Sequence, residues 1–526
     1  MTITFAWLQL LPEAARAQAQ ADLSQLVFQA KQAKVLEQML RLRRLERYGP
    51  RGEQLNEAQL LLLTQEPSVT PQELAQEASL PTTEKQAAQR QVKRRQRPHP
   101  GREPLPAHLP RQEVVIPCEP AQQACTVCQQ SRTVIGYDAS EELCVKPAEY
   151  FVKVTKREKR ACRQHPEGGV ATAPLPDKIL PKGKLSDDVL IDTLIRKYRW
   201  HEPLYRQALK LELEAGVVLD RRTLDAGVLW QGELLQHLQP PMRQELLVSR
   251  YLQADETPVA VQTPQVKGRT HRAYLFEYSQ PHGVVVFDFQ MGRGRAGPNA
   301  FLKGFIGTLQ TDGYAGYDEM APPKPDKPWP IRRAGCLAHA RRRFVKAHQL
   351  APQETEALAV VQTIGRLYQV ERQAREQGLN AAGRLALRQQ HSVGIMAELE
   401  AQIQQLRPRV LPKSMLGEAC AYAMGQWDQL QVFLRDGEIE IDNNRCEQAI
   451  RPVALGRKNW LQIGAESAGP KVAAIMSVME TCRRLKVDVR AYLQDVLPHL
   501  ARWPLPKVTE LTPKAWQSAQ AKKVAA

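Results

Sequence analysis

The pattern of the chain changes at Tyr251-Leu252-Gln253-Ala254-Asp255, where a short apolar run ends on a carboxylate. Two alternating runs follow, over residues 272–278 and 284–289, and the turn residues between them predict a β-hairpin. A fourth run, residues 305–310, leads into Asp312. A last short strand is expected over 332–337, directly before a basic helix. Strands and helices in this succession predict an α/β fold.

Helical patterns follow this group of strands. Residues 352–434 are rich in Ala, Leu, Gln and Glu and predict long helices. A helix over 442–458 comes next, with Asp442 or Asn443 as its N-cap. The remainder, residues 461–526, is expected to be mostly helical.

The segment before the strands, residues 171–247, predicts two helices separated by a turn at Gly216. A helix–turn–helix that contacts DNA phosphates through Arg221 and Arg222 fits this spacing, and so does a plain helical hairpin. Gly227 weakens the second helix. Both interpretations stay open at this point.

Three further regions precede these helices. Residues 1–63 carry an apolar stripe that fits an amphipathic helix or a coiled coil. Residues 64–112 predict an exposed basic linker, which either follows DNA phosphates or is only a solvated tether. Residues 113–170 hold a cysteine cluster and alternating segments, which indicate a small β-rich module. The basic cluster of the linker consists of Lys93, Arg94 and Arg95.

Length and composition limit the class of protein. With 526 residues the chain is too long for a single core, so several domains are expected. Lys and Arg number 73 against 56 Asp and Glu, and the net charge of +17 favours a polyanionic partner, although a basic soluble protein fits it too. No apolar run is long enough for a membrane helix, and no basic segment precedes the apolar start, so neither a membrane protein nor a signal peptide is expected. The uneven spread of nine cysteines indicates a reducing cytoplasm and one local metal site.

Three carboxylates stand where a metal site would need them. Asp255 and Asp312 each follow a strand run, and Glu447 lies on the helix over 442–458. Strand ends meet at one rim of a sheet, and a helix beside that rim can add a third ligand. Carboxylates suit Mg²⁺, and two such ions activate a water or a 3′-hydroxyl in phosphodiester chemistry. Spacing alone is explained more simply by turn residues at the strand ends and a solvated helix residue.

A denser set of motifs favours the metal site over the simpler explanation, because the chain resembles the insertion sequence 66 family of bacterial transposases. The resemblance runs in family order over nearly all of residues 98–515. It rests on Ala254-Asp255-Glu256-Thr257-Pro258, Thr311-Asp312-Gly313-Tyr314, Cys336-Leu337-Ala338-His339-Ala340-Arg341-Arg342, Asp442-Asn443-Asn444 through Glu447 to Arg451-Pro452, and Gly456-Arg457-Lys458-Asn459-Trp460.

The resemblance implies a ribonuclease-H-like mixed sheet that carries an Asp, Asp, Glu triad, of the DDE type. Its three carboxylates fall on Asp255, Asp312 and Glu447, and residues 352–434 become a helical insertion before the third. Leu337 occupies a position where the family pattern has a tryptophan, and this departure does not affect the three carboxylates. Residues 223–227 are atypical, which leaves DNA contact by that helix uncertain.

Two ligand pairs in the β-rich module predict a structural Zn²⁺ site. Three thiolates and one imidazole satisfy tetrahedral zinc, and the intervening strands fit a ribbon-like module. The resemblance also implies a zinc-binding domain here. The alternative is a degenerate module with buried thiols. The expected ligands are Cys125, Cys128, Cys162 and His165.

Several basic residues near the triad are candidates for DNA contact. Arg341 and Arg342 begin the basic helix beside His339, and their guanidinium groups suit phosphate. Arg451, Arg457 and Lys458 are expected to contact the DNA backbone rather than the reacting bond.

We therefore expect a DNA transposase that binds the terminal inverted repeats of its element and transfers strands to target DNA, with Mg²⁺ or Mn²⁺ at the triad. A homodimer should pair two ends, with accessory proteins of the same element, in a bacterial cytoplasm near the nucleoid. A DNA-binding protein that has lost cleavage, and a nuclease without joining activity, are the alternatives. The expected regions are residues 1–63, 64–112, 113–170, 171–247, a catalytic domain over 248–460 and 461–526.

Overall fold

The computed structural model describes residues 185–264, 269–317, 331–353 and 355–525, with 150–153, 159–161, 170–172, 177–180 and scattered positions between 12 and 36. Residues Met1–Glu77 and Pro174–Ala526 make up one compact unit, and Ala78–Ala173 make up a second. In the second unit, β1 (Lys159–Ala161) pairs with β2 (Val170–Thr172) in antiparallel orientation. Within the described residues, no helix has the length and apolar character needed to cross a membrane.

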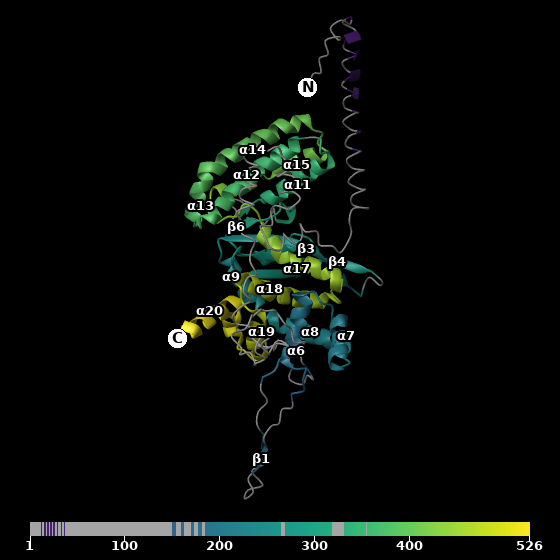
Figure 1. Ribbon diagram of the computed structural model, residues 1–526, viewed down its shortest axis with the longest axis vertical. Coiled ribbons are helices and arrows are strands. Elements are labelled where there is room, and N and C mark those ends of the chain that lie inside the picture. The colour runs from purple at the N-terminus through teal and green to yellow at the C-terminus, as the bar shows by residue number, and fades with distance from the viewer. Residues whose placement is uncertain are drawn as a thin grey trace, which may run out of the picture. The chain divides into compact units, whose positions relative to one another are not determined.

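A five-stranded mixed sheet lies at the centre of the larger unit (Figure 1). Its spatial order is β5-β4-β3-β6-β7, in which β3, β4 and β5 are antiparallel and β6 and β7 run parallel to β3. This mixed order is consistent with a ribonuclease-H-like domain, as the resemblance implies. The strands are β3 (Tyr251–Gln262), β4 (Thr270–Ser279), β5 (Val285–Gln290), β6 (Gly307–Gln310) and β7 (Ile331–Ala334).

Strand β3 is longer than the sequence predicts. The predicted run ends at Asp255, whereas β3 continues to Gln262 and pairs with β4 from Gln253 onward. Pro258 fits because β6 pairs only with residues 251–253, so this part of β3 has no neighbouring strand on that side. A proline, which cannot donate a backbone hydrogen bond, is tolerated at such an open edge.

The open edge of β5 is covered by helices rather than by another strand. Phe287 N donates to Ser477 Oγ at 2.8 Å, and Phe287 O accepts from Gln239 Nε2 at 3.0 Å. Val285 N and O are both bonded to the Thr481 hydroxyl, at 3.0 and 2.9 Å. Polar side chains thus satisfy backbone groups that would otherwise offer a template for aggregation. The helices involved are α9 (Gln239–Leu247) and α18 (Gly469–Leu485).

Helices from before and after the sheet pack against each other. α18 also packs on α8 (Arg221–Gln236), so helices from before and after the sheet meet. The boundaries predicted after residues 247 and 460 therefore fall inside one compact unit. α19 (Val489–Leu500) and α20 (Pro513–Ala525) complete this C-terminal part.

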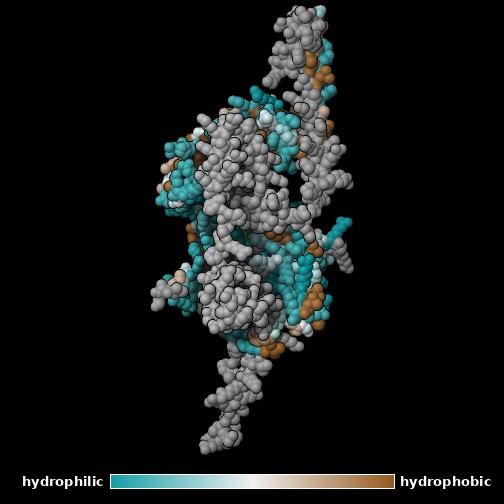
Figure 2. Space-filling view, in the orientation of Figure 1, coloured by the Kyte–Doolittle hydropathy of each residue, from teal (hydrophilic) through white to brown (hydrophobic). Residues whose placement is uncertain are grey.

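Three helices precede α9 and the sheet. α6 (Asp187–Tyr198) is followed by α7 (Leu204–Ala215), Gly216 in the left-handed conformation, and α8. Gly227 lets α8 approach α6 closely, since a Cβ there would lie 2.7 Å from Leu190. One face of α7 leaves large apolar side chains in solvent, a patch visible in Figure 2. It includes Tyr205, Leu209 and Leu213.

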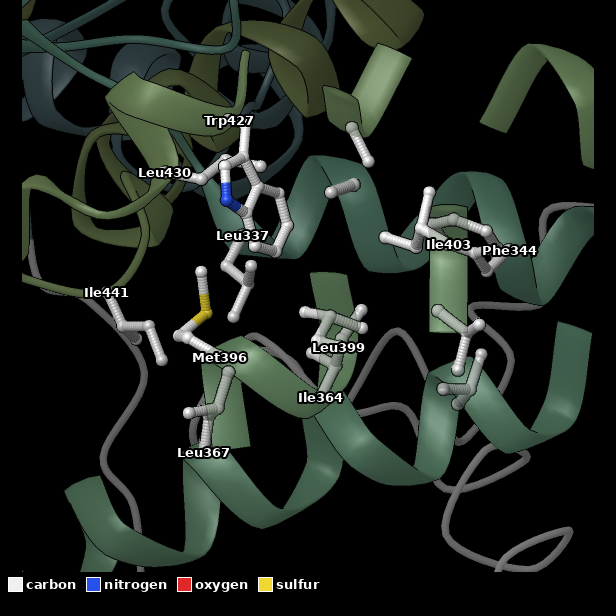
Figure 3. Packing of buried hydrophobic residues seen from close by; sticks show 14 of the residues in the cluster. Leu337, Phe344, Ile364, Leu367, Met396, Leu399, Ile403, Trp427, Leu430 and Ile441 are labelled. Atoms are coloured by element: carbon white, nitrogen blue, oxygen red, sulfur yellow. The ribbon is translucent and has the colours of Figure 1, made fainter. Parts of the chain in front are cut away.

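The predicted insertion, residues 352–434, and the basic helix that precedes it form a helical subdomain around one apolar core (Figure 3). Leu337 and Phe344 of α11 pack with Leu399 and Ile403 of α14, and Trp427 closes the cluster. The helices are α11 (Leu337–Leu350), α12 (Glu356–Glu376), α13 (Ala381–Leu387), α14 (Val393–Leu406), α15 (Met415–Gly425) and α16 (Trp427–Leu430), with a short π-helix, η4 (Arg388–Ser392). The chain then enters α17 (Asn444–Trp460), which packs on β3 and β4.

Candidate active site

The register of the two central parallel strands brings the two aspartates to the same level. Gln253 of β3 is paired with Gln310 of β6. Asp255 and Asp312 each follow two residues after this pair. Asp255 lies within β3, not at its end as predicted, but β6 stops before this level. The two carboxylates therefore lie where β3 and β6 diverge.

The third carboxylate comes from the N-terminal part of α17. The helix begins at Asn444, and Glu447 lies in its first turn. Asn443 makes no capping hydrogen bond through its side chain. Instead, Asp442 Oδ1 accepts a hydrogen bond from Asn444 N at 3.1 Å, so the residue before the cap fulfils that role.

The three carboxylates share one electrostatic field. Burial raises the pKa of Asp255 well above its ordinary value, and the charges of Glu447 and Asp312 raise it further. Glu256 adds a smaller effect in the same direction. Like charges gathered in a buried place are costly unless protons or cations neutralise them. The donor set, made only of carboxylate oxygens, suits a hard divalent cation such as Mg²⁺.

Glu447 is engaged by the basic helix α11 rather than by the aspartates. Its Oε2 accepts from Arg342 Nη2 at 3.2 Å, and its Oε1 lies 3.5 Å from His339 Nε2. Glu447 Oε1 is buried and accepts no hydrogen bond within the described structure. Among the described residues, no three Asp, Glu, His or Cys side chains are gathered tightly enough to hold a metal ion. The chemistry of the site fits a divalent cation, while Glu447 is paired with protein cations.

His339 contributes to this pairing from a half-buried position. Burial lowers the pKa of His339 below its ordinary value, and the charge of Glu447 opposes that shift. Asp312 acts on His339 in the same direction as Glu447, which again puts the second and third carboxylates in one neighbourhood.

Glu256, the neighbour of Asp255, has a different set of contacts. Its carboxylate accepts from Arg293 Nε at 2.8 Å and lies 3.4 Å from the Tyr317 hydroxyl. Arg293 in turn lies over the ring of Tyr314, 4.0 Å from its centre. These contacts make Glu256 a support for the loop after β6.

The predicted DNA-contacting residues near the triad have four different surroundings. Arg341 is only 1% exposed, which excludes it as a surface contact because α11 turns it into the helical core. Arg457 Nη1 donates to Thr257 Oγ1 at 3.1 Å, so this guanidinium ties α17 to β3. Arg342 is more than half exposed and Lys458 is exposed. Arg451 Nη1 is buried without a hydrogen-bond partner in the described structure, and Arg451 feels the charge of Glu447.

The remaining predicted sites lie outside the described residues. They are the basic cluster Lys93, Arg94 and Arg95 and the zinc ligands Cys125, Cys128, Cys162 and His165. The structural Zn²⁺ site therefore stays a prediction.

Two glutamines near the site were not predicted from the sequence. Gln253 and Gln310 are buried and bonded to each other between β3 and β6. The signal for them was present, because Gln-x-Asp occurs at both strands, in Gln253-Ala254-Asp255 and Gln310-Thr311-Asp312. A repeated amide in otherwise apolar strands indicates a buried partner.

Comparison with known families matches this region of the chain. Residues 182–471 match the model described as "Transposase IS66 family", a span of more than half the chain that includes all three carboxylates. Residues 35–114 match a model described as "Transposase C of IS166 homeodomain".

Three uncharacterized proteins of Sinorhizobium fredii (strain NBRC 101917 / NGR234) are similar over most of their length. The protein y4jD is 33% identical over 430 residues, which cover 79% of this chain and 82% of the relative. The protein y4qI is 34% identical over 442 residues, 81% of this chain and 79% of the relative. The protein y4hP is 31% identical over 444 residues, 81% and 78% of the two chains.

Proposed function

Since the chain belongs to the IS66 family of DDE transposases, which implies DNA strand transfer with divalent metal ions, we propose that Asp255, Asp312 and Glu447 are its catalytic carboxylates. The proposed substrates are the terminal inverted repeats of its element and a target DNA. Two protomers would process two ends together, with accessory proteins of the element as further candidates for partners.

One observation carries this assignment. Asp255 and Asp312 follow a register pair of neighbouring parallel strands at equal distance, and the charges of Asp312 and Glu447 both act on Asp255. Carboxylates scattered over a surface would be solvated, and their charges would not raise the pKa of Asp255. Like charges gathered in a half-buried place, where they raise the pKa of one member, are typical of functional sites.

The carboxylates and two arginines would have different roles in the reaction. Asp255, Asp312 and Glu447 would hold the divalent cations, which stabilise the attacking and leaving oxygens of a phosphodiester when bound. Arg451 would contact phosphate, because its Nη1 has no hydrogen-bond partner in the described structure and the charge of Glu447 acts on Arg451. Arg342 would release Glu447 and turn to a phosphate, since a guanidinium binds either anion through the same fork.

A cleavage assay on a labelled DNA end of the element tests the proposal. Asp255→Asn is expected to reduce Mg²⁺- or Mn²⁺-dependent cleavage about a thousand-fold, because a metal ligand contributes several kcal/mol to the transition state. Asp288→Asn is the matched control, since Asp288 is a partly buried aspartate on β5 and lies in the same sheet. Cleavage by Asp255→Asn at the rate of this control would exclude the assignment. Binding without cleavage by the wild-type protein would favour a transposase that retains only DNA binding.

A further inference from the structure

Two buried glutamines precede the proposed catalytic aspartates, and the proposed chemistry does not use them. Gln253 and Gln310 are 0% and 1% exposed. Gln253 and Asp255 lie on the same face of β3, because alternate residues of a strand point the same way. Buried amides of this kind need hydrogen-bond partners, so their partners show what they hold.

The two amides meet at the hydroxyl group of Tyr251. Gln253 Nε2 lies 3.0 Å from the Tyr251 hydroxyl oxygen and 2.9 Å from Gln310 Oε1. The Tyr251 hydroxyl donates to the same Gln310 oxygen. We call these three residues the amide cluster. It joins β3 to β6 directly before the level at which the strands diverge.

The amide cluster also binds the chain that leads to the third carboxylate. Gln310 Nε2 donates to Glu440 O at 2.8 Å, and Gln253 Nε2 donates to Asp442 O at 2.9 Å. Glu440 N donates to the Tyr251 hydroxyl at 3.1 Å. Three backbone groups of residues 440–442 are therefore fixed to the two central strands by side chains.

The other side of the same segment is held by the helical subdomain. Ile439 and Ile441 are 1% and 5% exposed and belong to its apolar core, where Figure 3 shows Ile441 beside Met396 and Leu367. Alternate residues thus face the core of the insertion, while the backbone between them is bonded to the sheet. The segment cannot shift without breaking one of these two sets of contacts.

Residues 439–442 end directly before α17, which begins at Asn444 and carries Glu447 in its first turn. A rigid helix moves with its first residues, so the place of the segment decides the place of Glu447. We propose that Tyr251, Gln253 and Gln310 are positioning residues that fix the place of Glu447 relative to Asp255 and Asp312. This inference rests on the proposed function, and these residues are not expected to touch metal or DNA.

Binding of Mn²⁺ to the full chain, followed by the electron paramagnetic resonance signal of free Mn²⁺, tests the inference without relying on activity. Gln253→Leu and Gln310→Leu keep the side-chain volume and remove the hydrogen bonds. Each is expected to weaken Mn²⁺ binding about ten-fold, the usual effect of losing a group that orients a metal ligand. Tyr251→Phe removes only the hydroxyl group and is expected to weaken binding in the same direction.

Gln231→Leu is the matched control. Gln231 is 0% exposed, and its Nε2 donates to Leu190 O at 3.0 Å and to Gly227 O at 3.1 Å. It loses a comparable pair of buried bonds on α8, away from the amide cluster, so its Mn²⁺ affinity should match that of the wild type. A general loss of stability would weaken all variants alike.

The outcomes separate this inference from the proposed function. If Asp255→Asn loses Mn²⁺ binding while Gln253→Leu and Tyr251→Phe keep wild-type affinity, the amide cluster is only structural and the inference is wrong. If Asp255→Asn binds Mn²⁺ as well as the wild type, the proposed function itself fails. If the leucine variants do not fold, Tyr251→Phe decides the question. A Mn²⁺ affinity of Tyr251→Phe equal to or higher than that of Gln231→Leu would overturn the inference.

Discussion

Asp255 is a carboxylate that the metal-free fold holds at a cost. Burial, followed by the charges of Glu447 and Asp312, raises its pKa well above the ordinary value of 3.8. A carboxylate with a raised folded pKa contributes stability that is fully present below its unfolded pKa and is lost as pH rises through the folded pKa. The ionised carboxylate of Asp255, which would bind metal in the proposed function, therefore lowers the stability of the metal-free protein at neutral pH.

Asp255→Asn removes that charge and is expected to raise the thermal midpoint at neutral pH by about 2 °C or more in the presence of EDTA. At acidic pH, where Asp255 is protonated, the two midpoints should converge. Thermal melts of both proteins over a pH series measure the difference, and the other buried carboxylates cancel because both proteins contain them. If the difference between the two midpoints were the same at every pH, the charge of Asp255 would not be destabilised by Asp312 and Glu447.

At this scale the sequence predicts residue types better than residue surroundings. Asp255, Asp312 and Glu447 could be named because their motifs resemble a family. That Arg341 is buried while Arg342 is exposed depends on which face of α11 meets the helical subdomain, and the run Arg341-Arg342-Arg343 does not reveal it. Gln253 and Gln310 could have been found from their equal spacing to the aspartates.

Whole elements were predicted where alternation or helical spacing is regular. The hairpin of β4 and β5 and the helix α17 agree with the expected segments within a few residues, α11 follows the last strand as expected, and α18 and α19 lie in the stretch expected to be helical. The length of β3 was missed, since Pro258 reads as a strand end unless the open side of the strand is known. The π-helix η4 was missed as well, because its sequence continues the helical pattern around it.

The π-helix carries a buried ion pair that holds the end of the insertion. Arg388 and Glu371 are 0% and 1% exposed, with Nε and Nη2 of Arg388 at 2.7 and 2.8 Å from the two carboxylate oxygens. Arg388 Nη1 also donates to the carbonyl oxygens of Phe433, Asp436 and Ile439, at 2.9, 3.0 and 2.9 Å. One side chain thus fixes the chain that returns from the insertion to α17.

Arg388→Met leaves the Glu371 charge buried and unpaired, so it should destabilise the protein by about 3–5 kcal/mol. Arg366→Met is the control, because the pair of Arg366 with Glu398 is exposed and should contribute about 1 kcal/mol at most. Thermal midpoints of the two variants measure the difference. Adding Glu371→Leu to Arg388→Met should restore part of the loss, whereas equal midpoints for the two single variants would contradict a buried pair.

The larger unit is built from distant parts of the chain, which local patterns cannot show. The boundary expected after residue 460 rests on a change from strand to helix patterns, yet α18 satisfies both backbone groups of Val285 through Thr481 and one of Phe287 through Ser477. These contacts join residues about 190 positions apart in sequence. The sequence of β5 alone does not show that the backbone groups at its outer edge are bonded to a distant helix. Only the three-dimensional structure reveals this contact.

A chain that stops after Trp460 is therefore expected to lose the fold, although it retains every proposed catalytic residue. It would expose the edge of β5 and the apolar face against which α18 packs, and open strand edges promote aggregation. A chain that stops after Thr512 loses only α20 and is the control, expected to melt cooperatively at a lower temperature. Solubility, size-exclusion profile and thermal melting compare the two. A soluble, cooperatively melting chain that ends at Trp460 would mean that the sheet is complete without its C-terminal helices.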